Sequence, residues 1–144
     1  QRAQRHALSV GLLMIDVDDF KSINDQYGHL VGDAVIRQIA DILRRSVRVF
    51  DICTRFGGEE FTVVLPGSGA DDAARIAERI RERIQSHLAP EPELAALRLT
   101  VSIGLAVSTP DSSAHDLIGA ADMALYHAKR TGKNQVRSAG RELS

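Results

Sequence analysis

The stretch Arg-Phe-Gly-Gly-Glu-Glu-Phe at residues 55–61 sets two carboxylates directly after two glycines, between two strand-like runs. Glycine reaches the positive φ angles of tight turns without a Cβ penalty, so the pair predicts a hairpin between residues 51–55 and 61–65. The missing side chains also let a ligand approach the main chain closely. Glu59 and Glu60 are then expected at the lip of a sheet, where they suit divalent metal and phosphate. Paired acids on a hairpin are more often solvated turn residues, so this motif needs support from elsewhere in the chain.

A second acidic cluster follows a strand-length apolar run at residues 10–15. A near-continuous apolar run of this length is typical of a central strand covered on both faces, and this one leads into Asp16. A carboxylate is costly to desolvate where a buried strand ends, and a bound cation is the usual compensation. If the two strands are neighbours, Asp16 and Glu59 can face each other and hold Mg²⁺ through oxygen ligands. Asp18 and Asp19 are assigned instead to the start of the following helix, which they favour through its dipole.

The composition predicts a single compact domain without a broad charged surface. The 144 residues are 44% hydrophobic, enough to bury a core, and the formal net charge of −1 argues against a basic field for nucleic acid or anionic membrane. The single cysteine, Cys53, cannot form an internal disulfide, which fits a reducing cytosol, and we interpret it as core filler. The sequence contains neither a long apolar span nor a signal-peptide pattern, so a cytoplasmic domain without membrane contact is expected.

Helical spacing of apolar residues predicts four helices. Apolar side chains recur every three and four positions in the longer segments, and a short helix follows the first strand. The expected helices cover residues 19–27, 30–47, 70–88 and a segment that begins after Ser113. The last helix starts with a capping box, because Asp116 lies three positions after Ser113, and it stops before Gly132. Residues 89–92 are expected to form a loop, since neither proline there can continue a helix.

Strict alternation of apolar and smaller residues predicts a strand over residues 97–105. Such a strand has one apolar face and one smaller, more polar face. A last strand is expected near residues 134–137. The resulting order is strand, helix, helix, hairpin, helix, strand, helix, strand. This layering predicts an α+β fold with a mostly antiparallel central sheet flanked by helices.

Four stretches of the chain together resemble one known family. They are residues 16–33, 55–61, 101–104 and 121–129. Their sequences and their order resemble the GGDEF family of diguanylate cyclases, whose signature takes its Gly-Gly-Glu-Glu-Phe form here. The resemblance spans nearly the whole chain. It implies a palm-like sheet related to nucleotide cyclases and polymerases, which the patterns alone do not predict.

The resemblance implies that two GTP molecules are condensed into cyclic di-GMP with release of two pyrophosphates. In each step a ribose 3′-hydroxyl attacks the α-phosphorus of the other nucleotide, and Mg²⁺ or Mn²⁺ lowers the pKa of the hydroxyl and neutralises phosphate charge. Asp16 and Glu59 match the family's metal ligands, helped by the main-chain carbonyl of Val17. Glu60 belongs to the same signature and is counted as catalytic, with its share of metal binding and general-base duty left open.

The family's guanine-binding positions correspond to Asn24 and Asp33. A carboxylate accepts hydrogen bonds from guanine N1 and the exocyclic amine, whereas adenine offers an acceptor at N1 and lacks that amine. Leaving such groups unpaired makes the wrong base costly, so Asp33 supports GTP over ATP. As isolated residues, both would be interpreted as turn or cap residues, and their joint spacing from Asp16 favours base recognition.

Three lysines are the candidates for binding phosphate: Lys21, Lys129 and Lys133. Each alone would be interpreted as a solvent-facing helix residue, and the family pattern favours a site. Many relatives carry arginine at the position of Lys133, where lysine keeps the positive charge but lacks the bidentate fork. The substrate-binding set implied by the resemblance is completed by Phe20, Gly57 and Gly58.

The segment Arg-Val-Phe-Asp at residues 48–51 matches the Arg-x-x-Asp product-inhibition site that many family members carry. An arginine fork grips guanine O6 and N7 or a phosphate, while the aspartate accepts from the guanine edge. Arg48 and Asp51 are also spaced as ordinary salt-bridge partners. Their register with Gly57 favours inhibition by cyclic di-GMP, and Arg79 is expected to add a third contact.

Family members usually begin with an Asp-x-Leu-Thr segment, and this chain starts too late to include one. Residues 1–144 are therefore expected to be one catalytic domain without that segment and without any upstream module. Upstream sensory or receiver modules commonly bring two catalytic domains together and can anchor the whole protein to a membrane. Because one site holds one GTP, the reaction requires a homodimer. The isolated fragment is expected to be weakly active or inactive.

Two other functions stay open from the sequence. A non-catalytic cyclic di-GMP receptor would keep the fold, although degenerate signatures are its usual mark and the signature here is intact at residues 57–61. A related dinucleotide cyclase would use another base, which Asp33 argues against. Identification of the product formed from GTP or from ATP separates these functions from a diguanylate cyclase.

Overall fold

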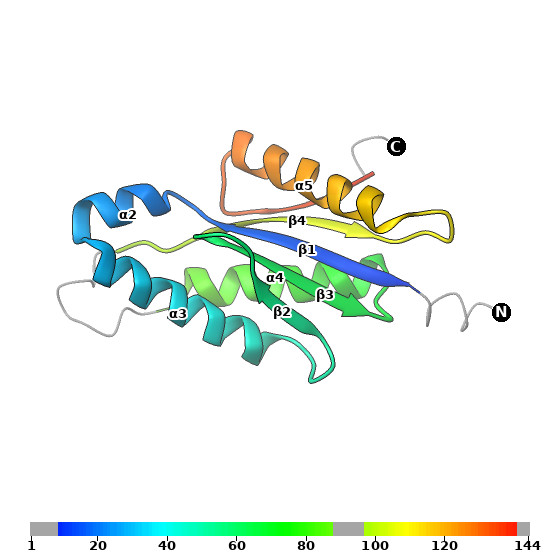
Figure 1. Cartoon of the computed structure of the whole chain (residues 1–144), viewed down its shortest axis with the longest axis horizontal. Helices are drawn as coiled ribbons and strands as arrows, with labels where there is room; N and C mark the ends of the chain where they lie inside the picture. Colours follow the sequence, from blue (N-terminus) through cyan, green and yellow to red (C-terminus); the bar gives the residue numbers. More distant parts are fainter. Residues whose placement is uncertain (1–8, 88–96, 141–144) are drawn as a thin grey trace.

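The computed structural model describes residues 9–87 and 97–140, in which five strands form one sheet. The strands are β1 (Val10–Val17), β2 (Ile52–Arg55), β3 (Glu60–Pro66), β4 (Val101–Val107) and β5 (Val136–Ser138). Their spatial order is β2-β3-β1-β4-β5, and among these pairs β4 with β5 is parallel. The described helices are α2 (Phe20–Tyr27), α3 (His29–Ser46), α4 (Ala70–Gln85) and α5 (Ala114–Arg130). The predicted α+β fold with a mostly antiparallel sheet is confirmed (Figure 1).

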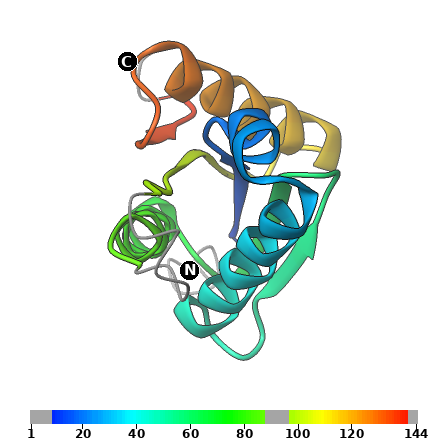
Figure 2. The ribbon, with the colours of Figure 1, turned by 90° about the vertical axis from the view of Figure 1, so that its left-hand side faces the viewer.

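β1 is the central strand, and its apolar run is buried on both faces. Leu13, Ile15 and Val17 join the core cluster that includes α3 and α4, while Leu12 and Met14 join the cluster that includes α5. Figures 1 and 2 show α5 on one face of the sheet and α3 with α4 on the other. Burial of each such side chain contributes about 1.5–3 kcal/mol relative to leaving it in water. This double covering fixes the end of β1, where the first acidic residues lie.

The predicted hairpin is present, with β2 and β3 paired antiparallel as far as Arg55 opposite Phe61. In the intervening turn, the Phe56 amide donates a 2.6 Å hydrogen bond to the Glu60 carbonyl. Gly57 has a φ of +86°, a left-handed conformation that a side chain would strain. The hairpin therefore returns the two glutamates of the signature to the end of β1.

β4 begins at Val101 rather than at residue 97. Its length follows from its neighbour, because Val17 opposite Val101 is the last pair between β1 and β4. The predicted small face of β4 is covered by α5, and a Cβ at Gly104 would collide with the α5 main chain at Ala121. Small residues on this face let the helix pack closely on the sheet.

The helices follow the expected segments with small shifts at their ends. The apolar side of α4 is buried as predicted, at Ala73, Ile76, Ala77, Ile80 and Ile84. α5 starts with the predicted capping box, in which Ser113 and Asp116 exchange hydrogen bonds with each other's main chain. The predicted end of α4 at Leu88 and the loop at residues 89–92 lie outside the described residues. None of the described helices has the length and apolar content needed to cross a bilayer.

Candidate active site

Three acidic residues lie where β1 ends and β3 begins, and we call this group, Asp16, Glu59 and Glu60, the acidic edge. The predicted neighbouring of the two strands is confirmed, since the Val17 amide also donates a 3.1 Å hydrogen bond to the Glu59 carbonyl. The expectation that Asp16 faces Glu59 needs one correction. In this antiparallel register the residue directly opposite Asp16 is Glu60.

The Asp16 carboxylate is mostly buried and incompletely satisfied. Its side chain is 16% exposed, and within the described residues its Oδ1 atom is buried without a hydrogen bond. The Lys129 ammonium lies 3.3 Å from that oxygen, an ion-pair contact that lacks the geometry of a hydrogen bond. Burial raises the pKa of Asp16, and Lys129 offsets this effect only in part. A buried oxygen in this state is suited to ligating a hard cation.

The two glutamates of the acidic edge are affected by the charge of Asp16. Burial raises the pKa of both Glu59 and Glu60, and the negative charge of Asp16 raises it further. A divalent cation would relieve this repulsion, so the donor set fits Mg²⁺ or Mn²⁺. In residues 9–87 and 97–140, however, no three acidic, histidine or cysteine side chains already converge closely enough to hold an ion.

The prediction that Asp18 assists the start of α2 through the helix dipole is wrong. Its side chain is 2% exposed and lies among four hydrogen-bond donors. The donors are Ser102 Oγ at 2.7 Å, Thr100 Oγ1 at 2.8 Å, Lys129 Nζ at 3.0 Å and the Asn134 amide at 3.0 Å. Burial alone would raise the pKa of Asp18, but the bonds from Ser102, Thr100 and Lys129 bring it below its ordinary value. Asp18 is therefore ionised and fully paired.

Asp19 lies at the start of α2, where the sequence analysis placed it. It caps α2 with a left-handed backbone at φ 56°, and its side chain makes no capping bond. Its Oδ1 atom instead lies 2.6 Å from the Lys133 ammonium, and this contact raises the pKa of Lys133. Lys129 and Lys133, two of the predicted phosphate lysines, thus both lie beside the aspartates that follow β1. They place positive charge next to the acidic edge.

The predicted guanine residues lie on the two helices that follow β1. Asn24 packs against Gly32, where a Cβ would collide with Asn24 Oδ1 and lie 3.3 Å from the Phe20 ring. Gly32 thus permits the close approach of α2 to the start of α3. Asp33, the next residue, is exposed. Asn24 and Asp33 are therefore brought together, whereas the Phe20 side chain is buried in the core and leaves only its main chain for a ligand.

Lys21 and the signature glycines are exposed. Lys21 has 90% of its side chain exposed and pairs with Asp25 at 3.2 Å, so the described part of the chain does not join it to the acidic edge. Gly58 lies at the tip of the hairpin, where a Cβ would meet no atom within 4 Å. The fold itself does not crowd that position, which fits the predicted approach of a ligand to the main chain.

Arg48 and Asp51 form an ion pair before β2. The Asp51 side chain is 0% exposed and accepts hydrogen bonds from Arg48 Nε at 2.9 Å and Nη2 at 3.0 Å. Arg48 also donates a 2.6 Å hydrogen bond to Ser68 Oγ, and its guanidinium lies 4.8 Å from the centre of the Phe50 ring. The bond to Asp51 raises the pKa of Arg48. The prediction that Arg48 and Asp51 are salt-bridge partners is thus confirmed. Any ligand that binds here would meet an arginine that is already paired with Asp51.

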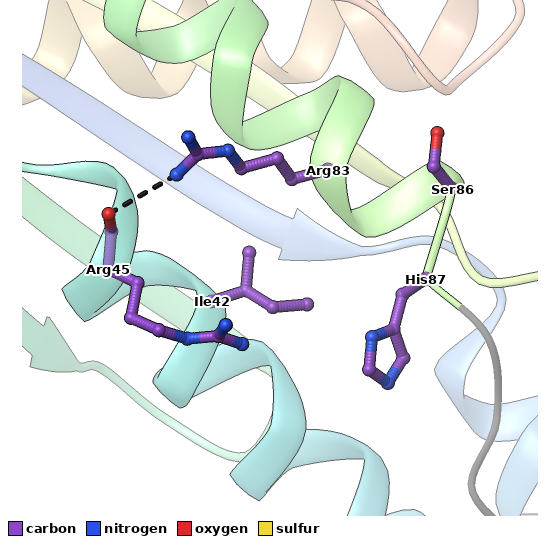
Figure 3. A pocket seen from close by; sticks show the side chains of 5 residues that line it. All are labelled: Ile42, Arg45, Arg83, Ser86 and His87. Atoms are coloured by element: carbon purple, nitrogen blue, oxygen red, sulfur yellow. Dashed lines mark hydrogen bonds between the residues drawn. The ribbon is translucent and has the colours of Figure 1, made fainter.

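Arg79 lies close to that motif, because it donates a 3.0 Å hydrogen bond to the carbonyl of Ser46 at the end of α3. One turn further along α4, Arg83 donates to the carbonyl of Arg45 at 3.2 Å (Figure 3). A cavity of about 490 Å³ opens beside this contact, lined by Ile42, Arg45, Arg83, Ser86 and His87. None of these five residues belongs to the acidic edge, and Arg83 donates to the carbonyl of Arg45 and to the hydroxyl of Ser46 at the end of α3.

The sequence analysis did not identify the residues that donate hydrogen bonds to Asp18, although the sequence pattern around β4 indicates two of them. Residues two apart on a strand share a face, so Asp16 and Asp18 point the same way. Ser102 is the β4 partner of Asp16, which puts it and Thr100 on that same face. The polar face of the alternating strand therefore indicates the hydroxyls that pair with Asp18. Asn134 lies in the turn before β5 and has no comparable local signal.

Comparison with known families gives a match over residues 1–135 to the model described as diguanylate cyclase, GGDEF domain. The probable diguanylate cyclase DgcT of Escherichia coli strain K12 is 40% identical over 127 residues, which cover 87% of this chain and 28% of DgcT. The response regulator PleD of Caulobacter vibrioides is 41% identical over 133 residues, which cover 88% of this chain and 28% of PleD. The chain thus spans less than a third of the length of these two relatives.

Solved structures share the fold. The GGDEF domain of DgcB from Caulobacter crescentus, in complex with c-di-GMP, matches with a TM-score of 0.86 at 34% identity, covering 95% of this chain and 81% of that one. The active GGEEF domain of a diguanylate cyclase from Vibrio cholerae gives a TM-score of 0.86 at 34% identity, covering 97% and 88%. The sheet, the acidic edge and these matches agree, and the chain belongs to the GGDEF domain family of diguanylate cyclases.

Proposed function

We propose that this domain is a diguanylate cyclase, which condenses two GTP molecules into cyclic di-GMP and releases two pyrophosphates. In each of two bond-forming steps, the 3′-hydroxyl oxygen of one GTP attacks the α-phosphorus of the other. The bond from that phosphorus to the pyrophosphate oxygen breaks, and the hydroxyl proton passes to a carboxylate. Membership of the family and the named relatives support this reaction.

The proposal rests on two oxygens that both lie near the Lys129 ammonium. Lys129 Nζ lies 3.3 Å from Asp16 Oδ1 and 3.4 Å from the Val17 carbonyl, so these oxygens converge on one positive charge. We assign both, with Glu59, to hold Mg²⁺ or Mn²⁺. These residues would hold a divalent cation, which would lower the pKa of the attacking hydroxyl and neutralise phosphate charge. Glu60, opposite Asp16, is assigned to accept the proton.

The residues around the acidic edge supply the nucleotide contacts. Asn24 and Asp33, brought together by the packing of α2 on α3, are assigned to the guanine edge. Lys129 and Lys133 are assigned to the triphosphate, with Lys21 and the main chain at the hairpin glycines as further contacts. A bound triphosphate would draw Lys129 away from Asp16, which leaves that carboxylate free for the cation.

We infer that two copies of the domain face each other during the reaction. Each acidic edge serves one GTP, and closing the dinucleotide ring takes a phosphodiester bond at each of two nucleotides. Because the chain spans 28% of DgcT and of PleD, we further infer that other modules of a longer protein bring the two copies together. The reaction is assigned to the cytoplasm.

Incubation of the chain, fused to a dimerising segment, with GTP and Mg²⁺ tests this function. We expect cyclic di-GMP and pyrophosphate, identified by mass spectrometry, and no cyclic dinucleotide from ATP. Glu59→Gln is expected to abolish the product while the circular dichroism spectrum stays unchanged. Binding of cyclic di-GMP without any product from GTP would indicate a receptor, and a product from ATP would indicate another dinucleotide cyclase.

We also propose that cyclic di-GMP binds at Arg48 and Arg79 and inhibits the enzyme; the DgcB domain is described in complex with c-di-GMP. Because Asp51 is buried and paired with Arg48, Arg48→Ala would leave an unpaired buried charge and damage the fold. Arg79→Ala is the cleaner variant, since Arg79 is exposed. It should weaken product inhibition with the initial rate retained, and unchanged inhibition would remove Arg79 from the site.

A further inference from the structure

Asp18 is a buried carboxylate at the end of β1 that the proposed reaction does not use. Its Oδ1 atom accepts from Ser102 Oγ and Lys129 Nζ, and its Oδ2 atom accepts from Thr100 Oγ1 and the Asn134 amide. An ionised carboxylate offers about four lone-pair positions, and the chain itself fills them all. Asp18 is thus closed to a metal ion, in contrast to the carboxylate of the acidic edge on the same face of β1.

One of the four donors fixes an unusual turn between α5 and β5. Gly132, Lys133 and Asn134 have φ angles of 129°, 63° and 48°. Left-handed backbone at two successive residues with side chains costs free energy and persists where the surroundings hold it. The bond from the Asn134 amide to Asp18 and a 2.9 Å bond from the Lys133 amide to the Ala128 carbonyl hold it here.

Both lysines assigned to the triphosphate depend on Asp18. Lys129 Nζ is held directly by Asp18 Oδ1 at 3.0 Å. Lys133 is held indirectly, because the amide of its neighbour Asn134 binds Asp18 Oδ2. Loss of the Asp18 charge would remove one support from each of the two cations, whereas the contact between Lys133 and Asp19 supports only Lys133.

We propose that Asp18 is a positioning residue, which fixes Lys129 and the α5–β5 turn against the end of β1 so that both lysines face the triphosphate. The nature of the ligand rests on the proposed function. Asp18 itself touches neither nucleotide nor metal. Holding the cations in place before the ligand arrives reduces the ordering cost of binding, so the effect of Asp18 falls on affinity for phosphate and not on recognition of the base.

Nucleotide binding to Asp18→Asn tests this role. Asparagine keeps the shape of the side chain, removes the charge that pairs with Lys129, and points an amide donor at other donors. NMR titrations in EDTA compare guanosine with a GTP analogue that carries a methylene bridge between its α- and β-phosphates and cannot react. We expect about tenfold weaker binding of the analogue and unchanged binding of guanosine. Unchanged affinity for the analogue, or equal losses for both probes, would overturn the proposal.

Hydrogen exchange at the Asn134 amide gives a second readout that needs no nucleotide. In Asp18→Asn this amide should exchange about tenfold faster, while amides of the central strand at Leu13 and Ile15 keep their protection. An equally protected Asn134 amide would show that the turn does not depend on Asp18. A wild-type chain that binds neither probe contradicts the proposed function, and the exchange measurement still decides whether Asp18 holds the turn.

Two further variants complete the test. One replaces Asp18→Asn if that variant does not fold, and the other is a control for net charge. Thr100→Val removes one donor but leaves the Asp18 charge, and it should show the same selective loss at about threefold. If Asp18→Asn does not fold, this variant carries the test, and unchanged affinity for the analogue overturns the proposal. Asp41→Asn removes a carboxylate that is 57% exposed on α3 and should change neither probe. A selective loss in Asp41→Asn would assign the effect to net charge instead.

Discussion

Asp16 and Asp18 lie two residues apart on the same face of the chain, yet their surroundings are opposite. Asp18 meets two hydroxyls, an amide and an ammonium, which lower its pKa. Asp16 meets Glu60 across the strand and has a buried oxygen without a hydrogen bond among the described residues, and burial raises its pKa. Asp18 therefore stabilises the fold. Asp16 keeps a buried oxygen without a hydrogen bond among the described residues, and a bound ligand would remove the cost of burying it.

Asp16→Asn is expected to raise the melting temperature of the chain in EDTA. Because burial raises the pKa of Asp16, its ionised form costs folding free energy at neutral pH, and the amide removes that cost. A rise of about 2–4 °C corresponds to roughly 1 kcal/mol in a domain of this size. Calorimetry measures it, and the difference from wild type should shrink in acid, where Asp16 is protonated. A lower melting temperature would show that the contact with Lys129 outweighs burial.

Asp18 is expected to stabilise the fold at neutral pH and to lose that effect in acid. Its folded pKa lies below the ordinary value of 3.8, so its contribution is present above the unfolded pKa and disappears as the pH falls through the folded one. Asp18→Asn should cost about 2–4 kcal/mol at neutral pH. Urea titrations over a pH series measure the difference, and a cost that does not vary with pH would point to packing instead of charge.

At the scale of the elements, the close packing of α5 on the sheet depends on one residue, Gly104. A Cβ at Gly104 of β4 would collide with the main chain of Ala121 and Leu125. Gly104→Ala should therefore cost about 3 kcal/mol in the free energy of unfolding. Because Lys129 is carried by the same helix, binding of the GTP analogue should weaken as well. Urea denaturation and the NMR titration measure the two effects.

Gly119→Ala is the matched control for that substitution. Gly119 lies on α5 itself, and a Cβ there would meet no atom within 4 Å. Alanine should stabilise the helix by about 0.5–1 kcal/mol, because glycine has poor helix propensity. The two alanine variants should thus change stability in opposite directions. Equal tolerance of both would contradict the close packing of α5 on β4.

Elements with a local signal could be predicted from the sequence. The glycines at residues 57–58 predicted the hairpin, and the serine before α5 predicted its capping box. Cys53 packs partly against the core as expected, and burial raises the pKa of its thiol. The start of β4 could not be predicted in the same way. It depends on where β1 ends, and the pairing of Val17 with Val101 is visible in neither segment alone.

The same distinction explains the site. The acidic edge was predictable because carboxylates lie at the end of β1 and at the start of β3, a feature that the sequence shows directly. The role of Asp18 was not, since its hydroxyl partners Thr100 and Ser102 lie 82 and 84 positions away in the chain. A pattern within one segment reveals which residues are polar. The register between segments decides whether a buried charge finds donors.

For the whole molecule, we expect the initial rate to rise with the square of the chain concentration when dimers are scarce. Under the proposed function, one acidic edge per chain serves one GTP, so two chains would have to meet for each product. Joining two chains by a dimerising segment should make the rate linear in concentration. Pyrophosphate release measured over a dilution series tests this expectation. Linear behaviour of a chain that light scattering shows to be monomeric would contradict the two-copy proposal.

The position of the central strand in the chain also affects how the molecule folds. β1 precedes both of its neighbours in the chain, and its Gly11 pairs with Val107. Closing such long loops costs entropy before any contact compensates it, which slows folding. During translation, the apolar side chains of β1 leave the ribosome long before the strands that cover them. Soluble yield in a host cell should therefore depend on chaperone supply during synthesis more than on the stability of the finished domain.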